Sequence, residues 1–588
     1  RFIQYLFKKM GTACKQVEEE LDPDTIKVIF KNGDTQRYPK PLYLKDIIPN
    51  HKTLSSPDLM ALLVNGKVTS INSTISTGIA KIYPILYDSA EGFATYKRTL
   101  VQIFATAVNK LYSKKFVAIV NHSVNNGYLW KKDNGEAFTE EEIKNIKEKM
   151  DELIKQDLPI EEIELSHQEA INYFKSINHK YSVSLIETNN VDIVKCSCID
   201  KVLTLFFRPL GASTGIIKEF DIRLSTDNNS LLLLFPTMTK SIPDVINEIE
   251  TKLTIESYAK SNEYSKRINL NCIGDWNKVV ISSQQELKDL ILTMNMHQEE
   301  EISNIAMTIG EKVKSGKVKF IGIAGPSASG KTTFSKKLGI ILKSIGIETI
   351  VISMDDYFKN RKNTPKDKNG NYDFECLEAL RIEDFNKDLN TLYKGESINR
   401  CVFDFVTGTY KYIENDVLKL PDKDSGKYGV VLCEGLHGID ERVTSSIPRD
   451  EKFFIYIAPL TPINSDEYNF FSDYVLRLYR RMIRDFRTRG NDASKTLKNW
   501  WSVAKGEEKY IYPFIDSSDL IWNSSLDYEV SVLFSFVYPL LRTVDVNDPY
   551  YYLACYLMDT MNNFLPISDE HVEKTAVLRE FIGGSSFE

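Results

Sequence analysis

A glycine-bracketed run near the middle of the chain has the residue types that bind phosphate. In the segment IGIAGPSASGKTT, residues 321–333, Gly325 and Gly330 enclose four residues, and Lys331 and Thr332 follow directly. Glycine lets backbone N–H groups turn toward phosphate oxygens, the lysine supplies a point charge for the β- and γ-phosphates, and the threonine hydroxyl can bind Mg²⁺. The pattern is that of a P-loop and predicts binding of a nucleoside triphosphate. The expected ATP contacts in this loop are Gly325, Ser327, Ala328, Ser329, Gly330, Lys331, Thr332 and Thr333.

The segments on either side of this loop fit the motif. Residues 318–324 form an apolar run typical of a buried strand, and residues 334–345 have the pattern of a helix. This order places the loop at a helix N-terminus, where phosphate groups bind. The alternative is a glycine-rich turn that merely precedes a helix, and the agreement of strand, loop, lysine and helix argues against it.

Acidic residues follow the next two predicted strands. The strand at 349–353 delivers Asp355 at its carboxyl end, and the strand at 428–433 is followed by Glu434. In open parallel sheets, ligands bind at the carboxyl ends of the strands. Asp355 could then take a proton from a substrate hydroxyl, and Glu434 could hold the water shell of a metal ion. The alternatives are a cap on the following segment for Asp355 and a solvated strand end for Glu434.

A cluster of arginines lies further along the chain. The run RLYRRMIRDFRTRG, residues 477–490, has helical spacing among its first arginines and two more beyond, and they are Arg477, Arg480, Arg481 and Arg484, then Arg487 and Arg489. Several guanidinium groups on one helix suit a lid that closes over phosphoryl charge during transfer. A basic helix is also typical of a solvated face or a nucleic-acid contact, so it is the neighbouring P-loop that favours the lid.

The P-loop, the two acids and the arginine run make this region resemble the uridine kinase and phosphoribulokinase family of P-loop kinases. Residues 372–410 align with a uridine–cytidine kinase pattern without a gap. The resemblance implies transfer of the ATP γ-phosphoryl group, with Mg²⁺, to a hydroxyl of a nucleoside or related polyol. It implies that Asp355 is the general base and that Thr332 and Glu434 lie at the metal ion. The other roles it implies are catalysis by Lys331 and Arg484, an ATP contact by Arg489, and substrate contacts by Asp355, Tyr357, Glu375, Phe403 and Arg481.

Four positions depart from that family where its members hold the sugar and the pyrimidine. Glu375 replaces an aspartate that holds the ribose hydroxyls, Phe403 and Gly408 replace a tyrosine and a histidine, and Asn491 replaces an arginine. Discrimination against a wrong base depends on buried hydrogen bonds of this kind. We therefore expect a small-molecule kinase whose acceptor is a nucleoside or another alcohol, such as a sugar phosphate.

The N-terminal half has a different pattern. Residues 26–93 alternate apolar and polar side chains in short strands, with turns at Asn32–Gly33 and Asn65–Gly66. The segments IKVIFKNGDTQRYP and LLVNGKV resemble a TGS domain, a β-grasp module found at the start of threonyl-tRNA synthetases. The resemblance continues through the charged helix at 138–161 to RPLGASTG at 208–215, in the order of the synthetase editing domain.

The editing chemistry of the synthetases is not expected here. That family uses two histidines one helical turn apart, followed by a cysteine and a histidine. Arg98 and Gln102 stand at the two helix positions, Phe207 is near the expected cysteine, and no histidine lies beside Pro209. We expect a fold that has lost these catalytic residues and binds a small ligand, RNA or a second subunit.

These patterns predict an α/β protein in five parts, with a mostly parallel kinase sheet preceded by a β-grasp domain and an α+β domain. The parts are a TGS-like domain (22–88), an editing-like domain (89–235), a helical connector (236–317), a P-loop uridine kinase-like domain (318–535) and a helical tail (536–588). At 588 residues, the chain is long enough for several domains. The resemblance favours a homodimer.

Composition sets limits on partners and location. The net charge of −7 gives no electrostatic footprint for general nucleic-acid binding, which argues against RNA except at a local patch of the N-terminal half. The eight cysteines form no CxxC pair, as expected for reduced thiols in the cytoplasm. No stretch approaches twenty apolar residues, so no membrane partner is expected. The start at Arg1 shows no signal-peptide pattern, although the absence of an initiator methionine leaves a leader open.

One rival function belongs to another class of protein. In it, the P-loop gates a regulatory protein by binding nucleotide, and the synthetase-like half senses RNA or a metabolite. An Asp355→Asn variant separates the two, because it should abolish phosphoryl transfer and leave ATP binding and a purely sensory function intact.

Overall fold

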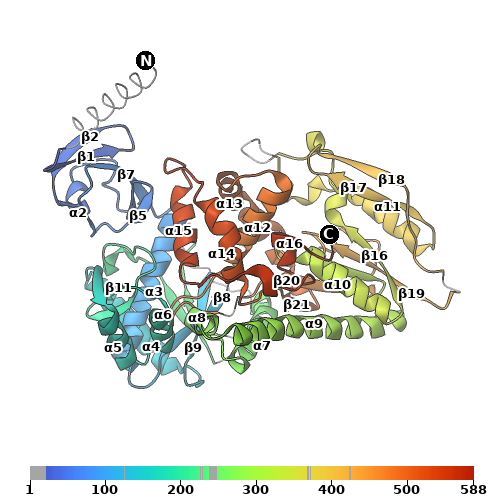
Figure 1. Ribbon diagram of the computed structural model, residues 1–588, viewed down its shortest axis with the longest axis horizontal. Helices are drawn as coiled ribbons and strands as arrows, with labels where there is room; N and C mark the ends of the chain where they lie inside the picture. The colour runs from blue at the N-terminus through green and yellow to red at the C-terminus, as the bar shows by residue number, and fades with distance from the viewer. Residues whose placement is uncertain are drawn as a thin grey trace, which may run out of the picture.

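The computed structural model describes residues 22–587 except 125, 226, 228, 238–247, 367–369, 371, 423–424 and 462. Residues 238–247 of the expected connector and residue 588 of the expected tail lie outside the described residues. The N-terminal regions lie on the left of the view and the strands of the kinase-like region on the right, with helices between them (Figure 1).

The first region is a small β-rich domain built around one mixed sheet. Its strands lie in the order β2-β1-β7-β4-β5, with β1 parallel to β7 and the other pairs antiparallel. Ile26, Val28 and Phe30 alternate along β1 and are buried. Asn65 and Gly66 have φ angles of 49° and 79°, as the tight turn between β4 and β5 requires. The elements are β1 (Thr25–Phe30), β2 (Thr35–Pro39), β3 (Leu42–Tyr43), α2 (Leu44–Ile47), β4 (Leu59–Val64), β5 (Lys67–Thr69), β6 (Thr74–Ile75) and β7 (Ile79–Leu86).

The second region packs helices against two antiparallel sheets, β13-β14-β9-β8 and β10-β11-β12. Its central helix α3 is mostly buried, because apolar and small residues cover several of its faces. Two helices begin with complete capping boxes, Thr139 with Glu142 and Ser166 with Glu169. The elements are α3 (Ala90–Tyr112), β8 (Ala118–Val124), β9 (Gly127–Lys132), α4 (Glu140–Lys155), β10 (Glu161–Ser166), α5 (His167–Ser176), α6 (Lys180–Thr188), β11 (Ile193–Ile199), β12 (Val202–Leu205), η1 (Thr214–Ile216), β13 (Asp221–Leu224) and β14 (Leu231–Leu234).

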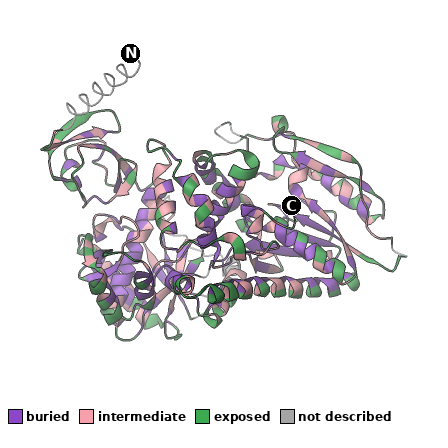
Figure 2. Ribbon diagram, viewed as in Figure 1, coloured by how far each residue is buried: buried purple, intermediate pink, exposed green. Residues whose placement is uncertain are grey.

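Three helices link this region to the kinase-like region. They are α7 (Glu248–Arg267), α8 (Ile273–Ile281) and α9 (Gln284–Lys314). Helix α9 extends along one edge of the molecule and reaches the kinase-like sheet (Figure 1). Buried residues such as Ile302, Ala306 and Ile309 place one face of α9 in the main apolar core, whereas its outer face carries exposed residues (Figure 2).

The kinase-like region has five strands in the order β16-β19-β15-β20-β21, and every pair is parallel. Along β15, Ile321 and Ile323 join one apolar core, whereas Phe320 and Ala324 join another on the opposite face. Helices therefore cover both faces, and the prediction of a mostly parallel sheet is confirmed. The elements are β15 (Phe320–Ala324), α10 (Lys331–Ser344), β16 (Ile347–Ser353), η2 (Met354–Tyr357), η3 (Arg361–Asn363), η4 (Leu377–Ala379), α11 (Ile382–Tyr393), β17 (Ile398–Asp404), β18 (Thr409–Leu418), β19 (Tyr428–Glu434), η6 (Arg449–Glu451), β20 (Lys452–Ala458), α12 (Asp473–Arg489), α13 (Ala493–Tyr510), η7 (Tyr512–Ser517), β21 (Leu520–Asn523) and α14 (Glu529–Leu541).

The C-terminal segment packs back onto the kinase-like region. Its elements are α15 (Tyr551–Met561), η8 (Asp569–His571) and α16 (Arg579–Ile582). Val577, Leu578 and Phe581 have no exposed surface and belong to the same core as helices α10 and α12. Helix α16 lies near α12 and α10, at the centre of the molecule (Figure 1).

Candidate functional site

The predicted P-loop connects the end of β15 to the start of α10. Ala328 and Gly330 have φ angles of 60° and 89°, so the backbone turns sharply before the helix begins at Lys331. A Cβ atom on Gly325 would lie 2.1 Å from the carbonyl oxygen of Ile457 on β20, which excludes a side chain there. The loop thus wraps around the N-terminus of a helix, where unpaired backbone N–H groups attract phosphate.

Lys331 lies folded against this loop. Its ammonium group donates to the carbonyl oxygens of Gly325 at 2.9 Å and Pro326 at 3.1 Å. Burial lowers the pKa of Lys331, while the charges of Glu434 and Asp355 oppose that shift. The lysine and the two predicted acids are therefore close enough to act on one another at the same edge of the sheet.

Glu434 and Thr332 lie together, as the sequence predicts for a metal site. Glu434 Oε1 accepts a hydrogen bond from the Ser353 hydroxyl at 3.1 Å and lies 3.5 Å from Thr332 Oγ1. Burial raises the pKa of Glu434 to about 7, although the nearby Lys331 charge opposes it. Ser353 was missed by the sequence reading, although its place at the last position of β16 was a usable signal.

These oxygen donors fit Mg²⁺, which takes one or two protein oxygens and completes its shell with phosphates and water. Within the described residues, no group of three or more His, Cys, Asp or Glu side chains could hold a metal by itself.

The two adjacent aspartates at the end of β16 differ in their surroundings. Asp356 accepts the backbone N–H of Phe403 at 3.1 Å, and burial raises its pKa to about 6. Asp355 is half-buried, and among the described residues its carboxylate has no hydrogen-bond partner. Asp356 therefore anchors the β17–β18 hairpin, and the role of Asp355 as the base stays a prediction.

Glu375 lies close to the same acids. A Cβ atom on Gly506 of α13 would lie 2.7 Å from the Glu375 side chain, so the two pack closely. Burial raises the pKa of Glu375 to about 7, the charge of Arg481 opposes that shift, and Asp355 reinforces it. The structure thus brings Glu375, Arg481 and Asp355 into one electrostatic neighbourhood.

Two of the predicted substrate residues are buried. The Tyr357 hydroxyl donates to Asp388 at 2.8 Å, and Tyr357 is 3% exposed. Phe403 is 5% exposed and meets the rings of Phe358 and Phe405 edge-on. These side chains form part of the wall around the site, and a direct contact with a substrate stays a prediction for both.

The arginine-rich helix α12 lies closed on the P-loop. Arg481 donates to the Ser327 hydroxyl at 2.7 Å, and Arg484 donates to the same oxygen at 3.2 Å. Burial, together with the neighbouring charges of Arg489 and Arg481, lowers the pKa of Arg484 to about 10. Arg489 instead pairs with Asp485 on its own helix at 3.2 Å. Arg481 and Arg484 are thus at the loop, and Arg489 is one turn further along.

Two buried ion pairs support this arrangement, and no sequence pattern marked their acidic members. Arg477 contacts both oxygens of Glu507 at 2.8 and 2.9 Å, and Glu507 also accepts the backbone N–H of Ser327 at 2.8 Å. Arg480 contacts the carboxylate of Glu529 at 2.6 and 2.8 Å. Both arginines are therefore structural and are not available to a substrate.

The positions at which the sequence analysis expected editing histidines line a small cavity. Arg98 and Gln102 of α3 line a space of about 30 Å³ with Phe207, Tyr468 and other residues. Arg98 pairs with Glu91 at 2.8 Å, and Gln102 accepts a hydrogen bond from Thr204. The side chains of Arg98 and Gln102 are therefore paired within the protein.

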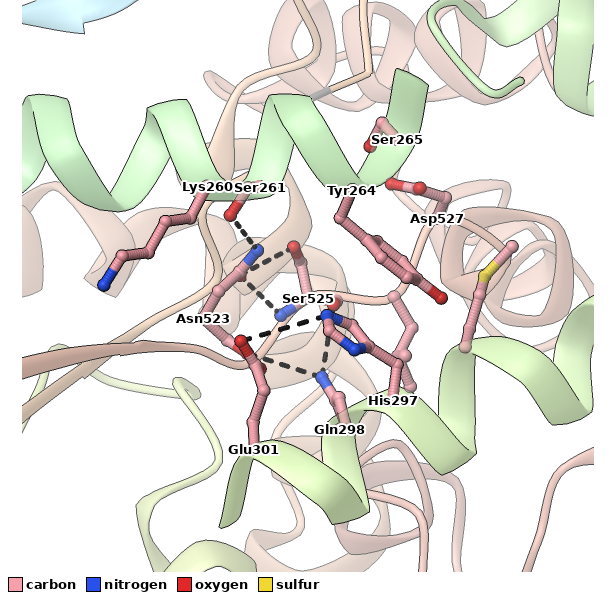
Figure 3. Close-up of a pocket in the computed structure, with 12 residues that line it drawn as sticks. Lys260, Ser261, Tyr264, Ser265, His297, Gln298, Glu301, Asn523, Ser525 and Asp527 are labelled. Atoms are coloured by element: carbon pink, nitrogen blue, oxygen red, sulfur yellow. Dashed lines mark hydrogen bonds and ion pairs between the residues drawn. The ribbon is translucent and has the colours of Figure 1, made fainter. Parts of the chain in front are cut away.

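A further cavity, of about 50 Å³, lies between α7, α9 and the segment after β21 (Figure 3). The rings of Tyr264 and His297 stack at its side, with centroids 3.8 Å apart, and the Gln298 amide donates to the Asn523 carbonyl at 3.4 Å. None of the predicted site residues lines this cavity. Ser524, which lies between the lining residues Asn523 and Ser525, accepts a hydrogen bond from Arg480 of α12 at its backbone carbonyl.

Comparison with known proteins agrees with both resemblances. Residues 320–531 match the phosphoribulokinase / uridine kinase family. The C-terminal region therefore carries a P-loop kinase domain of that family, as predicted. A solved structure of a possible uridine kinase from Bacillus stearothermophilus is 19% identical, with 38% of this chain and 98% of that chain covered and a TM-score of 0.26.

The N-terminal half is similar to threonine–tRNA ligases. The enzyme from Clostridium kluyveri is 30% identical over 258 residues, which are 42% of this chain. The enzyme from Desulforamulus reducens is 25% identical over 198 residues, which are 34% of this chain. The matches span only 39% and 31% of those ligases. In the part of the chain that the structure describes, no helix has both the length and the apolar character needed to cross a bilayer.

Proposed function

We propose that this protein is an ATP- and Mg²⁺-dependent kinase that phosphorylates a hydroxyl group of a nucleoside or a related polyol. The observation that carries the proposal is the position of Asp355 at the carboxyl edge of the parallel sheet. Among the described residues its carboxylate has no hydrogen-bond partner, and its charge acts on Lys331 and Glu434. A phosphate cradle alone would serve many functions, whereas a carboxylate beside it is what an acceptor hydroxyl needs.

In this proposal, the P-loop and α12 bind the nucleotide. Backbone N–H groups of the loop bind phosphate oxygens, and Lys331 exchanges its two carbonyl partners for the phosphates. Arg481 and Arg484 already point at Ser327 and are placed to balance charge on the group in transfer. Thr332 and Glu434 would hold Mg²⁺, which would neutralise part of the phosphate charge.

In this proposal, Asp355 and Glu375 contact the acceptor. Asp355 accepts the proton of the attacking hydroxyl, so that an oxygen with more negative charge meets the γ-phosphorus. Glu375 offers a second carboxylate, suited to neighbouring hydroxyls of a sugar. Phe403 adds an apolar wall and no hydrogen-bonding group, so we propose that the base is not read at this position.

A second candidate function is regulatory, and one observation favours it. Tyr468 and Asn469 line the cavity of the synthetase-like region together with Arg98, and the arginine helix α12 begins only a few residues later, at Asp473. A small ligand in that cavity would touch the segment that leads into α12. In this function the nucleotide site responds to the ligand instead of serving turnover.

Release of ADP from Mg²⁺ and ATP, measured with a panel of nucleosides, sugars and polyols, tests the proposal. Turnover that needs one acceptor would support it. Turnover with uridine or cytidine would show that the base is read elsewhere than at Phe403. Bound ATP without turnover on any acceptor would favour the regulatory function.

A further inference from the structure

The C-terminal tail lies on the phosphate-binding loop itself. Val577 packs against Gly330 so closely that a Cβ atom on the glycine would lie 2.5 Å from Val577 Cγ1. Three residues later, Glu580 Oε2 accepts two hydrogen bonds from Thr333, one from the backbone N–H at 3.1 Å and one from the hydroxyl at 2.8 Å. An acidic side chain of this chain therefore uses donors of the first turn of α10.

Those donors are the ones that a nucleotide needs. The backbone N–H groups of the first turn of a helix lack partners within the helix, and after a P-loop they bind phosphate oxygens. A carboxylate carries the same sign of charge and the same kind of acceptor oxygen as a phosphate. The charge of Glu580 also acts on the pKa values of Lys331, Glu434 and Arg484, so it lies near the centre of the site.

We propose that Glu580 is an internal anion that occupies part of the phosphate cradle, so that the tail is an autoinhibitory plug which a nucleoside triphosphate must displace. This inference rests on the proposed function of the loop. It goes beyond that function because it assigns a role to the tail, which carries none of the kinase motifs.

Other contacts of the tail would survive removal of the Glu580 charge. Arg487 of α12 donates to the Phe581 carbonyl at 2.7 Å, and Lys336 of α10 donates to the Phe587 carbonyl at 2.6 Å. Arg579 pairs with Asp569 at 2.7 Å and holds the turn of the tail itself. Because Arg487 lies on the same helix as Arg481 and Arg484, displacement of the tail also frees the helix that covers the phosphates.

Point variants of the full chain test the plug better than truncation, because truncation would remove completely buried side chains such as Phe581. Glu580→Gln keeps the shape and removes the charge, and Glu580→Ala also removes the acceptor. Glu570→Gln is the matched control, since Glu570 lies in the same tail with 65% of its side chain exposed. A thermal unfolding curve for each variant checks that the fold is retained.

The first measurement is the dissociation constant of Mg²⁺ and ATP by titration calorimetry. We expect roughly tenfold tighter binding for both Glu580 variants, because a charged competitor for the Thr333 donors is gone, and no change for Glu570→Gln. The second is hydrogen exchange of residues 576–587, which saturating ATP should increase in the unaltered protein. Equal or weaker ATP binding by the Glu580 variants would overturn the plug, as would tail exchange that ATP leaves unchanged.

These outcomes separate the plug from the proposed function. Unchanged binding together with acceptor-dependent turnover would remove the plug and leave the kinase. Absence of ATP binding in every variant, Glu580→Ala included, would overturn the kinase and with it the plug.

Discussion

The guanidinium of Arg477 and the carboxylate of Glu507 form an ion pair in which neither side chain is exposed to solvent. The same carboxylate accepts the backbone N–H of Ser327 in the phosphate-binding loop. The pair thus joins α12 to α13 and fixes one amide of the loop between them. Because both charges are buried, loss of either one would leave the other without a counter-charge and would destabilise the fold.

Glu507→Gln should destabilise the fold by about 3 kcal/mol, because Arg477 would remain buried without a counter-charge. The free energy of unfolding from urea titration measures the effect. Glu508→Gln is the control, because Glu508 is the next residue on α13 and is exposed. Equal unfolding midpoints for the two variants would show that the buried pair contributes nothing to stability.

Glu434→Gln should raise the Mg²⁺ concentration needed for half-maximal turnover by roughly tenfold or more, since a metal-binding carboxylate is lost. Turnover as a function of Mg²⁺, at fixed ATP, measures this. Chelation of the metal should abolish the activity of the unaltered protein. An unchanged Mg²⁺ requirement in the variant, matching that of the half-exposed control Glu441→Gln, would remove Glu434 from the metal site.

The pH dependence of acceptor use should reflect Glu375. Burial raises its pKa to about 7, so it is mostly protonated below that pH and ionised above it. If the ionised form binds acceptor hydroxyls, kcat/KM for the acceptor should rise as the pH increases from about 6 to about 8. The pKa of Glu434 is also raised to about 7, and its ionisation would instead alter how the use of Mg²⁺ and ATP depends on pH.

Glu375→Gln separates these two groups. This variant should make kcat/KM for the acceptor nearly independent of pH across that range. The pH dependence for Mg²⁺ and ATP should stay unchanged. An acceptor profile that keeps its shape in the variant would argue against a role for Glu375 in binding the acceptor.

The kinase-like and synthetase-like regions meet where Glu467 caps helix α6. Its carboxylate accepts the backbone N–H of Tyr181 at 2.7 Å and that of Ser182 at 3.2 Å. Glu467→Ala should cost about 1 to 2 kcal/mol, as for loss of a helix N-cap, and should speed hydrogen exchange in residues 180–188. Glu414→Ala, exposed on β18, serves as the control. Unaltered exchange in α6 would mean that Glu467 does not hold the two regions together.

Local sequence patterns predicted the strands and the helix around the P-loop well. Residues 320–324 and 428–434 are strands and residues 331–344 are a helix, because buried parallel strands are continuous apolar runs and the glycine–lysine–threonine sequence fixes the loop between them. The family and synthetase resemblances were also confirmed, because each depends on motifs that are contiguous in the chain.

The supporting contacts could not be predicted in this way. Glu507 and Glu580 lie far from the P-loop in the sequence, and nothing in their local sequence marks them as its partners. They became visible only when the fold paired their carboxylates with Ser327 and Thr333. The hydrogen bond from Tyr357 to Asp388 likewise joins two elements that are separate in the sequence.

The most direct test of the proposed kinase activity is phosphoryl transfer from labelled ATP to the acceptor by the Asp355→Asn protein. Loss of the base should slow transfer by roughly 10² to 10⁴-fold and leave ATP binding unchanged. Asp422→Asn, with 69% of its side chain exposed, should transfer at the normal rate. Transfer by Asp355→Asn at the rate of that control would contradict the proposal that Asp355 activates an acceptor hydroxyl beside the P-loop.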